Sequence, residues 1–114
     1  MEAFIDDGYT VEVGINEQSG VHPGMEFTYR PMVGNESRLM YAAVAGGDQN
    51  KALDSLADHI KQWSLGRPVS RENLERLTAP LFEKLWSIVA GNMAPDYLVE
   101  SNAEPTTVEE DQKN

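Results

Sequence analysis

Two histidines are the only imidazole groups in the chain that could bind a metal or act as a general base. His22 precedes Pro23, which favours an extended backbone at this position. His59 lies at the edge of an apolar helical face, one turn before Trp63. No second histidine or cysteine stands at ligand spacing from either residue, so the sequence gives a metal site no support. We interpret His59 as a structural residue packed on Trp63.

Carboxylates, hydroxyls and glycines give no catalytic pattern either. Asp54 and Asp58 share a helix face, but two lysines share it too and it lies opposite the apolar face, so we expect it to be solvated. The serines stand in no nucleophile-elbow motif, and the glycines match neither a dinucleotide fingerprint nor a phosphate loop. Because the chain has no cysteine, disulfides and thiol catalysis are excluded. The sequence therefore predicts a protein that is not an enzyme, with no catalytic, cofactor or metal residues.

The charge is strongly negative and unevenly distributed. The 114 residues include 19 acids and 9 Lys or Arg, a net charge of −10. Residues 1–26 hold six acids and no base, and residues 96–114 hold six acids and one base. This charge disfavours nucleic acids and anionic membranes as partners. Since the N-terminus lacks the pattern of a signal peptide and no segment approaches the ~20 apolar residues of a membrane span, we expect a cytoplasmic protein.

The N-terminal third has the alternation typical of strands. Residues 8–13 and 25–30 alternate apolar and polar side chains and are rich in strand-forming types. The turn signal His22-Pro23-Gly24 lies between them. We therefore expect a β-hairpin over residues 8–31.

The rest of the ordered chain has helical periodicity. Asn35, Asp48 and Ser70 are expected to cap the first three helices. The first would bury Leu39, Met40, Ala43 and Val44, and Trp63 would join the second helix to the last in the core. The predicted helices span residues 36–45, 48–63, 71–77 and 80–91. The fold class is therefore α+β, mainly helical, with a hairpin followed by three to four short helices.

The C-terminal segment is poor in apolar residues. It carries a proline at Pro105 and a Glu109-Glu110-Asp111 run. Such a segment buries too little surface to offset its ordering entropy. We expect one domain over residues 1–95 and a disordered acidic tail over residues 96–114.

The last predicted helix has an apolar arc of about 160°, wider than the ~100° stripe that one core contact requires. Leu81, Leu85 and Ile88 are expected to face the core, and Phe82 and Trp86 to lie at the margin, where aromatic residues commonly anchor a partner. The predicted partner-binding residues are Phe82, Trp86 and Val89 on this helix and Tyr29 on the hairpin. The strand over residues 27–30 is an alternative site, because an exposed edge can accept another strand.

The order of these elements resembles a known family. The segments that carry the resemblance are 27–31 (FTYRP), 59–65 (HIKQWSL), 68–77 (PVSRENLERL), 80–82 (PLF) and 88–91 (IVAG). Together they resemble the small tail assembly chaperones of long-tailed phages and prophages, over residues 27–91 of the 114. The resemblance implies a non-enzymatic protein that binds the helical tape measure protein and keeps it soluble in the host cytoplasm. The tail tube protein is a further candidate partner, and self-association into a homo-oligomer stays open.

Two other functions remain open from the sequence. The first is a structural virion component, such as a small tail or head–tail joining protein, that is retained in the particle. The second is a regulator of a cytosolic enzyme or an antitoxin-like binder, for which acidity is the only argument. The presence or absence of the protein in purified particles separates the chaperone from the virion component.

Overall fold

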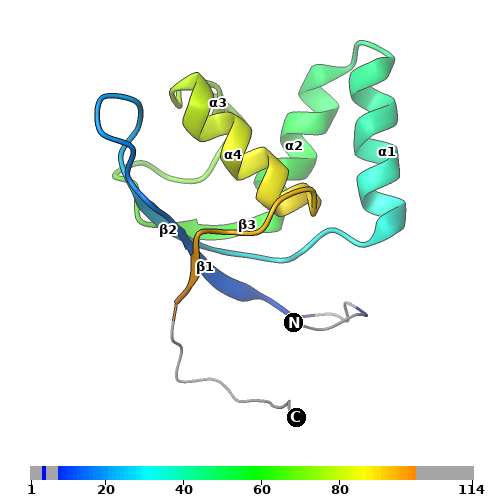
Figure 1. Ribbon diagram of the computed structural model, residues 1–114. Coiled ribbons are helices and arrows are strands. Elements are labelled where there is room, and N and C mark those ends of the chain that lie inside the picture. The colour runs from blue at the N-terminus through cyan, green and yellow to red at the C-terminus, as the bar shows by residue number, and fades with distance from the viewer. Residues whose placement is uncertain (1–3, 5–7, 100–114) are drawn as a thin grey trace.

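Strands and helices alternate in an α+β fold (Figure 1). The computed structural model describes Phe4 and residues 8–99. The α+β class and the N-terminal hairpin predicted from the sequence are confirmed, but two strands that were not predicted follow the hairpin. The elements of the described residues are β1 (Val11–Ile15), β2 (Met25–Tyr29), α1 (Gly34–Ala45), α2 (Gln49–His59), β3 (Ile60–Trp63), α3 (Arg71–Glu75), α4 (Ala79–Ala90) and β4 (Tyr97–Leu98).

The sheet extends beyond the expected hairpin. It has four antiparallel strands in the order β3-β2-β1-β4. In the hairpin Val13 pairs with Phe27, and Phe27 pairs in turn with Trp63 of β3. An isolated hairpin is only marginally stable, so the two added strands support it from both edges.

The predicted second helix over residues 48–63 is wrong in its last turn. The helix ends at His59, and Ile60–Trp63 continues as β3 along β2. Flanking backbone hydrogen bonds, from Arg30 N to His59 O (2.7 Å) and from Ser64 N to Glu26 O (2.8 Å), extend the pairing. The open edge of β2 offers backbone groups that a further helical turn would leave unpaired, so pairing outweighs helical periodicity here.

The predicted domain end at residue 95, with disorder from residue 96, is wrong for residues 96–99. Asp96 N donates to Gly14 O and Val99 N to Glu12 O, both at 3.0 Å, and between them Tyr97–Leu98 forms β4. The Tyr97 ring lies on Gly14, where a Cβ atom would overlap it. The Asp96 carboxylate accepts from Asn16 N (2.7 Å) and Lys84 Nζ (2.8 Å). Four residues thus add to the domain, and the remainder of the predicted tail lies outside the described residues.

Two of the three predicted helix caps are confirmed. The Asp48 carboxylate accepts from Lys51 N (3.1 Å) and the Ser70 hydroxyl from Asn73 N (3.1 Å). Asn35 is not the cap of α1 and lies inside its first turn, because the helix already begins at Gly34. Glu36 reaches back instead and accepts from Val33 N at 3.0 Å. This bond satisfies one of the N–H groups that a helix start leaves free.

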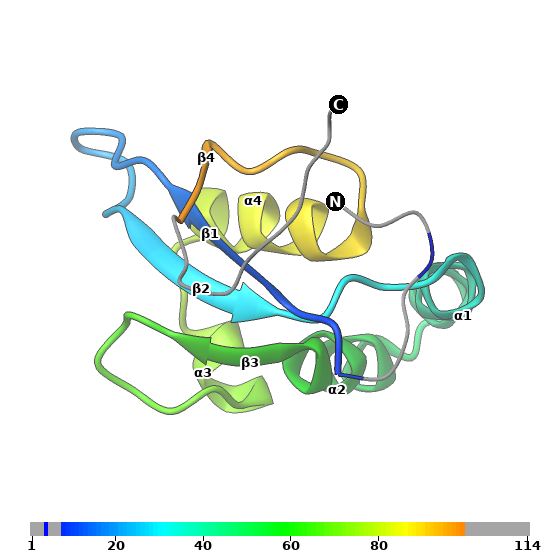
Figure 2. The same ribbon diagram turned by 90° about the horizontal axis from the view of Figure 1, so that it is seen from below.

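Helices α2, α3 and α4 lie on one face of the sheet, and α1 packs on α2 at the end of this helical layer (Figures 1 and 2). Alternate residues of β1 and β2 point into the layer between sheet and helices, while Glu26 on the other face is exposed. Leu81, Leu85 and Ile88 of α4 face this core as predicted. The main core consists of Val13, Ile15, Met25, Phe27, Tyr29, Leu56, Ile60, Leu74, Leu81, Leu85, Ile88 and Val89.

Candidate functional site

A partly buried polar cluster of Arg30, Glu36 and His59 joins three elements at one end of the helical layer. His59, at the end of α2, is 4% exposed. Its Nδ1–H donates to Ser55 O (2.8 Å), and its Nε2 lies 2.9 Å from Arg30 Nη2 and 3.2 Å from Glu36 Oε1. Arg30 in turn donates to both oxygens of Glu36, at 3.3 and 2.9 Å. Both ring nitrogens are occupied by protein groups, which supports a structural role, although the sequence predicted packing on Trp63 rather than these polar partners.

The cluster fixes the start of α1. The hydrogen bond from Arg30 lowers the pKa of the Glu36 carboxyl to about 2, with further lowering by Val33 N and His59. Glu36 therefore remains ionised at neutral pH, and Arg30 neutralises its charge in a partly exposed ion pair. Through this pair the N-terminus of α1 is tied to the end of β2 and to the end of α2.

The other polar residues considered in the sequence form no enclosed catalytic pair. Asp54 accepts from Arg71 in an exposed ion pair at 3.3 Å, and Asp58 is exposed. His22 is buried in the β1–β2 loop, where its Nδ1–H donates to Pro23 O at 2.8 Å. In the part of the chain that the structure describes, no three His, Cys, Asp or Glu residues gather in a way that could hold a metal ion.

The most distinctive surface feature is an apolar groove of about 640 Å³ between the helices, called the helix groove below. Helix α2 forms its floor with the buried Ala52 and Leu53, joined by Leu74 of α3. Helix α1 borders one side and α4 the other. The complete lining is Tyr41, Val44, Gln49, Ala52, Leu53, Leu74, Glu75, Leu77, Ala79, Phe82, Glu83 and Trp86.

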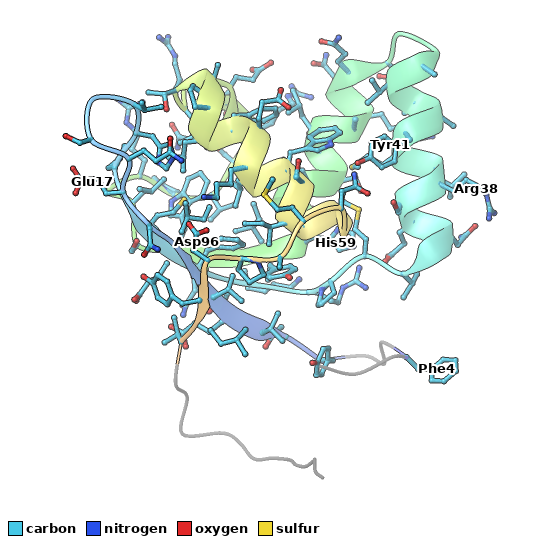
Figure 3. All side chains as sticks on the ribbon, viewed as in Figure 1. Phe4, Glu17, Arg38, Tyr41, His59 and Asp96 are labelled. Atoms are coloured by element: carbon cyan, nitrogen blue, oxygen red, sulfur yellow. The ribbon has the colours of Figure 1, made fainter. Side chains whose placement is uncertain are left out.

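Aromatic rings from both bordering helices, α1 and α4, line the helix groove. Phe82 and Trp86 are half-buried neighbours on α4, with ring centroids 5.8 Å apart. Tyr41 meets Trp86 edge-on with centroids 6.3 Å apart, and its hydroxyl accepts from the Asn92 amide. Figure 3 shows the Tyr41 side chain reaching from α1 toward α4. Partly exposed aromatic side chains of this kind combine large contact area with few rotatable bonds, which suits them to binding.

The structure brings two of the four predicted partner-binding residues to the groove. Phe82 and Trp86 lie at its margin, as predicted. Val89 and Tyr29 are only 1% and 3% exposed and belong to the core, so their prediction as partner-binding residues is wrong. The prediction that the strand over residues 27–30 offers an open edge is also wrong, because β2 lies between β1 and β3.

The sequence missed the contribution of α1. Its predicted inward residues were Leu39, Met40, Ala43 and Val44, but only Met40 is buried, in a small cluster with Ala52 and Ala90. Leu39 is 55% exposed and Val44 is 37% exposed. Helix α1 packs on α2 at the end of the layer and does not cover the sheet, so most of its apolar face stays open. The sequence does contain an apolar stripe on this helix, but the core is too small for the helix to bury all of it.

A second pocket, of about 570 Å³, lies at the edge of the sheet and is called the Trp63 pocket below. Its lining is Trp63, Leu65, Gly66, Arg67, Asn73, Arg76 and Leu77. Trp63 is half-buried and packs against the main core from β3, and its indole N–H donates to Arg67 O. It thus reaches the core from a strand and not, as predicted, from the second helix.

Comparison with known proteins gives no assignment: no family model, curated protein or solved structure matches the chain. No helix within the described residues combines the length and the apolar character needed to cross a bilayer.

Proposed function

We propose that the protein is a non-enzymatic binding protein that holds an amphipathic helix of its partner in the helix groove. The observation that carries this proposal is an apolar groove bordered by α1 and α4 and lined by Tyr41, Phe82 and Trp86. Amphipathic helices dock into such grooves through side chains at i, i+3, i+4 and i+7. The partly buried polar cluster of Arg30, Glu36 and His59 keeps α1 in place as one border of the groove.

The partner that we propose is the tape measure protein, and the role is that of a phage tail assembly chaperone. The sequence resemblance over residues 27–91 supports this role, and a groove for helices suits a long helical client. A net charge of −10 also supports it, because a highly charged protein keeps an aggregation-prone partner dispersed. The work of such a chaperone takes place in the host cytoplasm.

Capture of a co-expressed tape measure segment tests the proposal. Val44→Ser removes an exposed apolar contact from the groove, and Leu39→Ser makes the same kind of change on the same helix outside it. We expect Val44→Ser to weaken capture by about 1 kcal/mol and Phe82→Ala by about 1–3 kcal/mol, while Leu39→Ser captures like the parent. Far-UV circular dichroism must stay native in all three.

Equal capture by the Val44 and Leu39 variants would contradict the groove as the binding site. Purified phage particles give an independent measurement. A chaperone leaves before the tail is complete, so we expect the protein to be absent from them. Stoichiometric retention in the particle would favour a structural virion component instead.

A further inference from the structure

We propose that the helix groove selects helices whose apolar stripe is flanked by Lys or Arg. This inference rests on the proposed function and adds the chemistry of the partner. It follows from the charge of the groove lining, which differs in sign from that of two other pockets among the described residues.

Two carboxylates are the charged groups of the groove lining. Glu75 lies on α3 and Glu83 on α4, and both are exposed. Neither forms an ion pair with another of the described residues, and the lining contains no Lys or Arg. A helix seated on the apolar floor would therefore meet unneutralised negative charge on the side formed by α3 and α4.

Two other pockets among the described residues, which share Trp63 and Arg67, have the opposite charge. Arg67 and Arg76 line the Trp63 pocket, and Lys61 and Arg67 line a neighbouring pocket, with no acid in either lining. The acidic composition of the chain therefore does not impose an acidic lining everywhere, because the region around Trp63 and Arg67 has a basic one. Complementary charges beside an apolar contact strengthen the correct partner and disfavour partners of like charge.

The geometry of an α-helix allows one partner to contact both the apolar floor of the groove and the acidic residues of its lining. An α-helix with its side chains is about 10–12 Å across, and residues at i, i+3, i+4 and i+7 form its buried stripe. Long side chains beside that stripe extend along the rim while their apolar stems cover the groove walls. Lys and Arg in those positions reach carboxylates such as Glu75 and Glu83. The net charge of −10 further speeds the encounter with a basic segment.

Two synthetic helical peptides test the inference. They share one Leu-rich stripe and differ only in the residues beside it, which are Lys in one peptide and Glu in the other. We expect the Lys peptide to bind about fivefold to tenfold more tightly at low salt, and the difference to shrink at 0.5 M salt. The double variant Glu75→Lys/Glu83→Lys should remove or invert the preference.

A matched control separates the rim charges from the net charge. Glu17→Lys/Glu72→Lys changes the net charge by the same amount at exposed positions outside the groove lining. Figure 3 shows Glu17 on the β1–β2 loop, across the molecule from Tyr41. We expect this control to retain most of the preference for the Lys peptide. If Glu75→Lys/Glu83→Lys does not fold, the milder Glu75→Gln/Glu83→Gln should still reduce the preference.

The possible outcomes separate this inference from the proposed function. Equal binding of both peptides would overturn the charge selection and leave the helix groove intact as a binding site. The same loss of preference in the groove variant and the matched control would also overturn it, because the net charge would then suffice. Binding of neither peptide would contradict the proposed function itself.

Discussion

The helix groove and the Trp63 pocket lie on two sides of α3 and differ in both charge and construction. Leu77 lines both cavities. The groove is bordered by helices and carries Glu75 and Glu83, whereas the pocket lies beside edge strand β3 and carries Arg67 and Arg76. The difference shows that one short helix can separate two surfaces suited to opposite partners. Apolar lining alone does not distinguish them, but their charge does.

Each region also contains one of the two tryptophans of the chain. Trp86 lines the helix groove and Trp63 lines the second pocket. A variant with Trp63→Phe reports on the groove alone, and a variant with Trp86→Phe reports on the pocket alone. Tryptophan fluorescence can therefore follow the helix groove and the Trp63 pocket separately.

The largest loss of stability is expected from a change at Leu74, on which both the helix groove and the Trp63 pocket depend. Leu74 of α3 is fully buried, contributes to the main core and lines the helix groove. Leu74→Ala should lower the free energy of unfolding by about 2–5 kcal/mol. In urea both single-tryptophan forms should then unfold in the same shifted transition. Unfolding of Trp63 at an unchanged midpoint would show that the two regions are independent.

Trp63→Ala should cost less than removal of a core aromatic residue. The side chain is half-buried on an edge strand, so we expect a loss of about 1–3 kcal/mol instead of the 3–5 kcal/mol typical of a fully packed tryptophan. The folded variant should still bind the helical client with the parent's affinity. If the variant loses binding while its far-UV circular dichroism spectrum stays native, the client binds in the Trp63 pocket instead.

Removal of β4 should affect stability and spare both regions. A chain that stops after Pro95 loses the Asp96 contacts to Asn16 N and Lys84 and the pairing with β1. These are exposed hydrogen bonds, so we expect a loss of about 1–2 kcal/mol. A chain that stops after Val99 retains them and serves as the control. Identical melting temperatures of the two chains would show that β4 contributes nothing.

Acid should loosen the helix groove before the Trp63 pocket. The pKa of Glu36 is about 2 in the folded protein against an ordinary value of 4.5, so its stabilising contribution is complete above pH 4.5 and is lost as the pH falls toward 2. Since Glu36 anchors α1, Trp86 beside Tyr41 should respond first, with a small change in emission.

Two variants control for this acid effect. Glu36→Gln should abolish the difference between the two tryptophans. Asp96→Asn should preserve it, because Asp96 binds Lys84 and Asn16 N and has no contact with the α1 anchor. Simultaneous changes of both tryptophans in the parent would contradict the local role of Glu36.

Periodicity and capping in the sequence predicted most of the regular structure. The hairpin, the caps at Asp48 and Ser70 and the core face of α4 follow from local patterns that the tertiary structure retains. The same patterns placed Phe82 and Trp86 at the margin of α4. Those predictions succeeded because the residues that decide them are close in the sequence.

The errors arose where distant segments decide the structure. Ile60 and Trp63 continue the helical spacing of α2, and only the open edge of β2 makes their segment a strand. Two-residue β4 is too short for any alternation to be visible. Tyr29 and Val89 were predicted to lie on the surface, because sequence periodicity identifies the apolar face of a strand or helix but not the elements that pack against it. The open side of α1 was missed for the same reason.

Fluorescence titration with a tryptophan-free helical segment of the tape measure protein tests the central claim most directly. In the Trp63→Phe form, we expect a saturable change in Trp86 emission as the segment fills the helix groove. In the Trp86→Phe form, we expect no change at Trp63 over the same concentrations. A response of Trp63 with a silent Trp86 would contradict binding in the helix groove, as would binding that changes neither tryptophan.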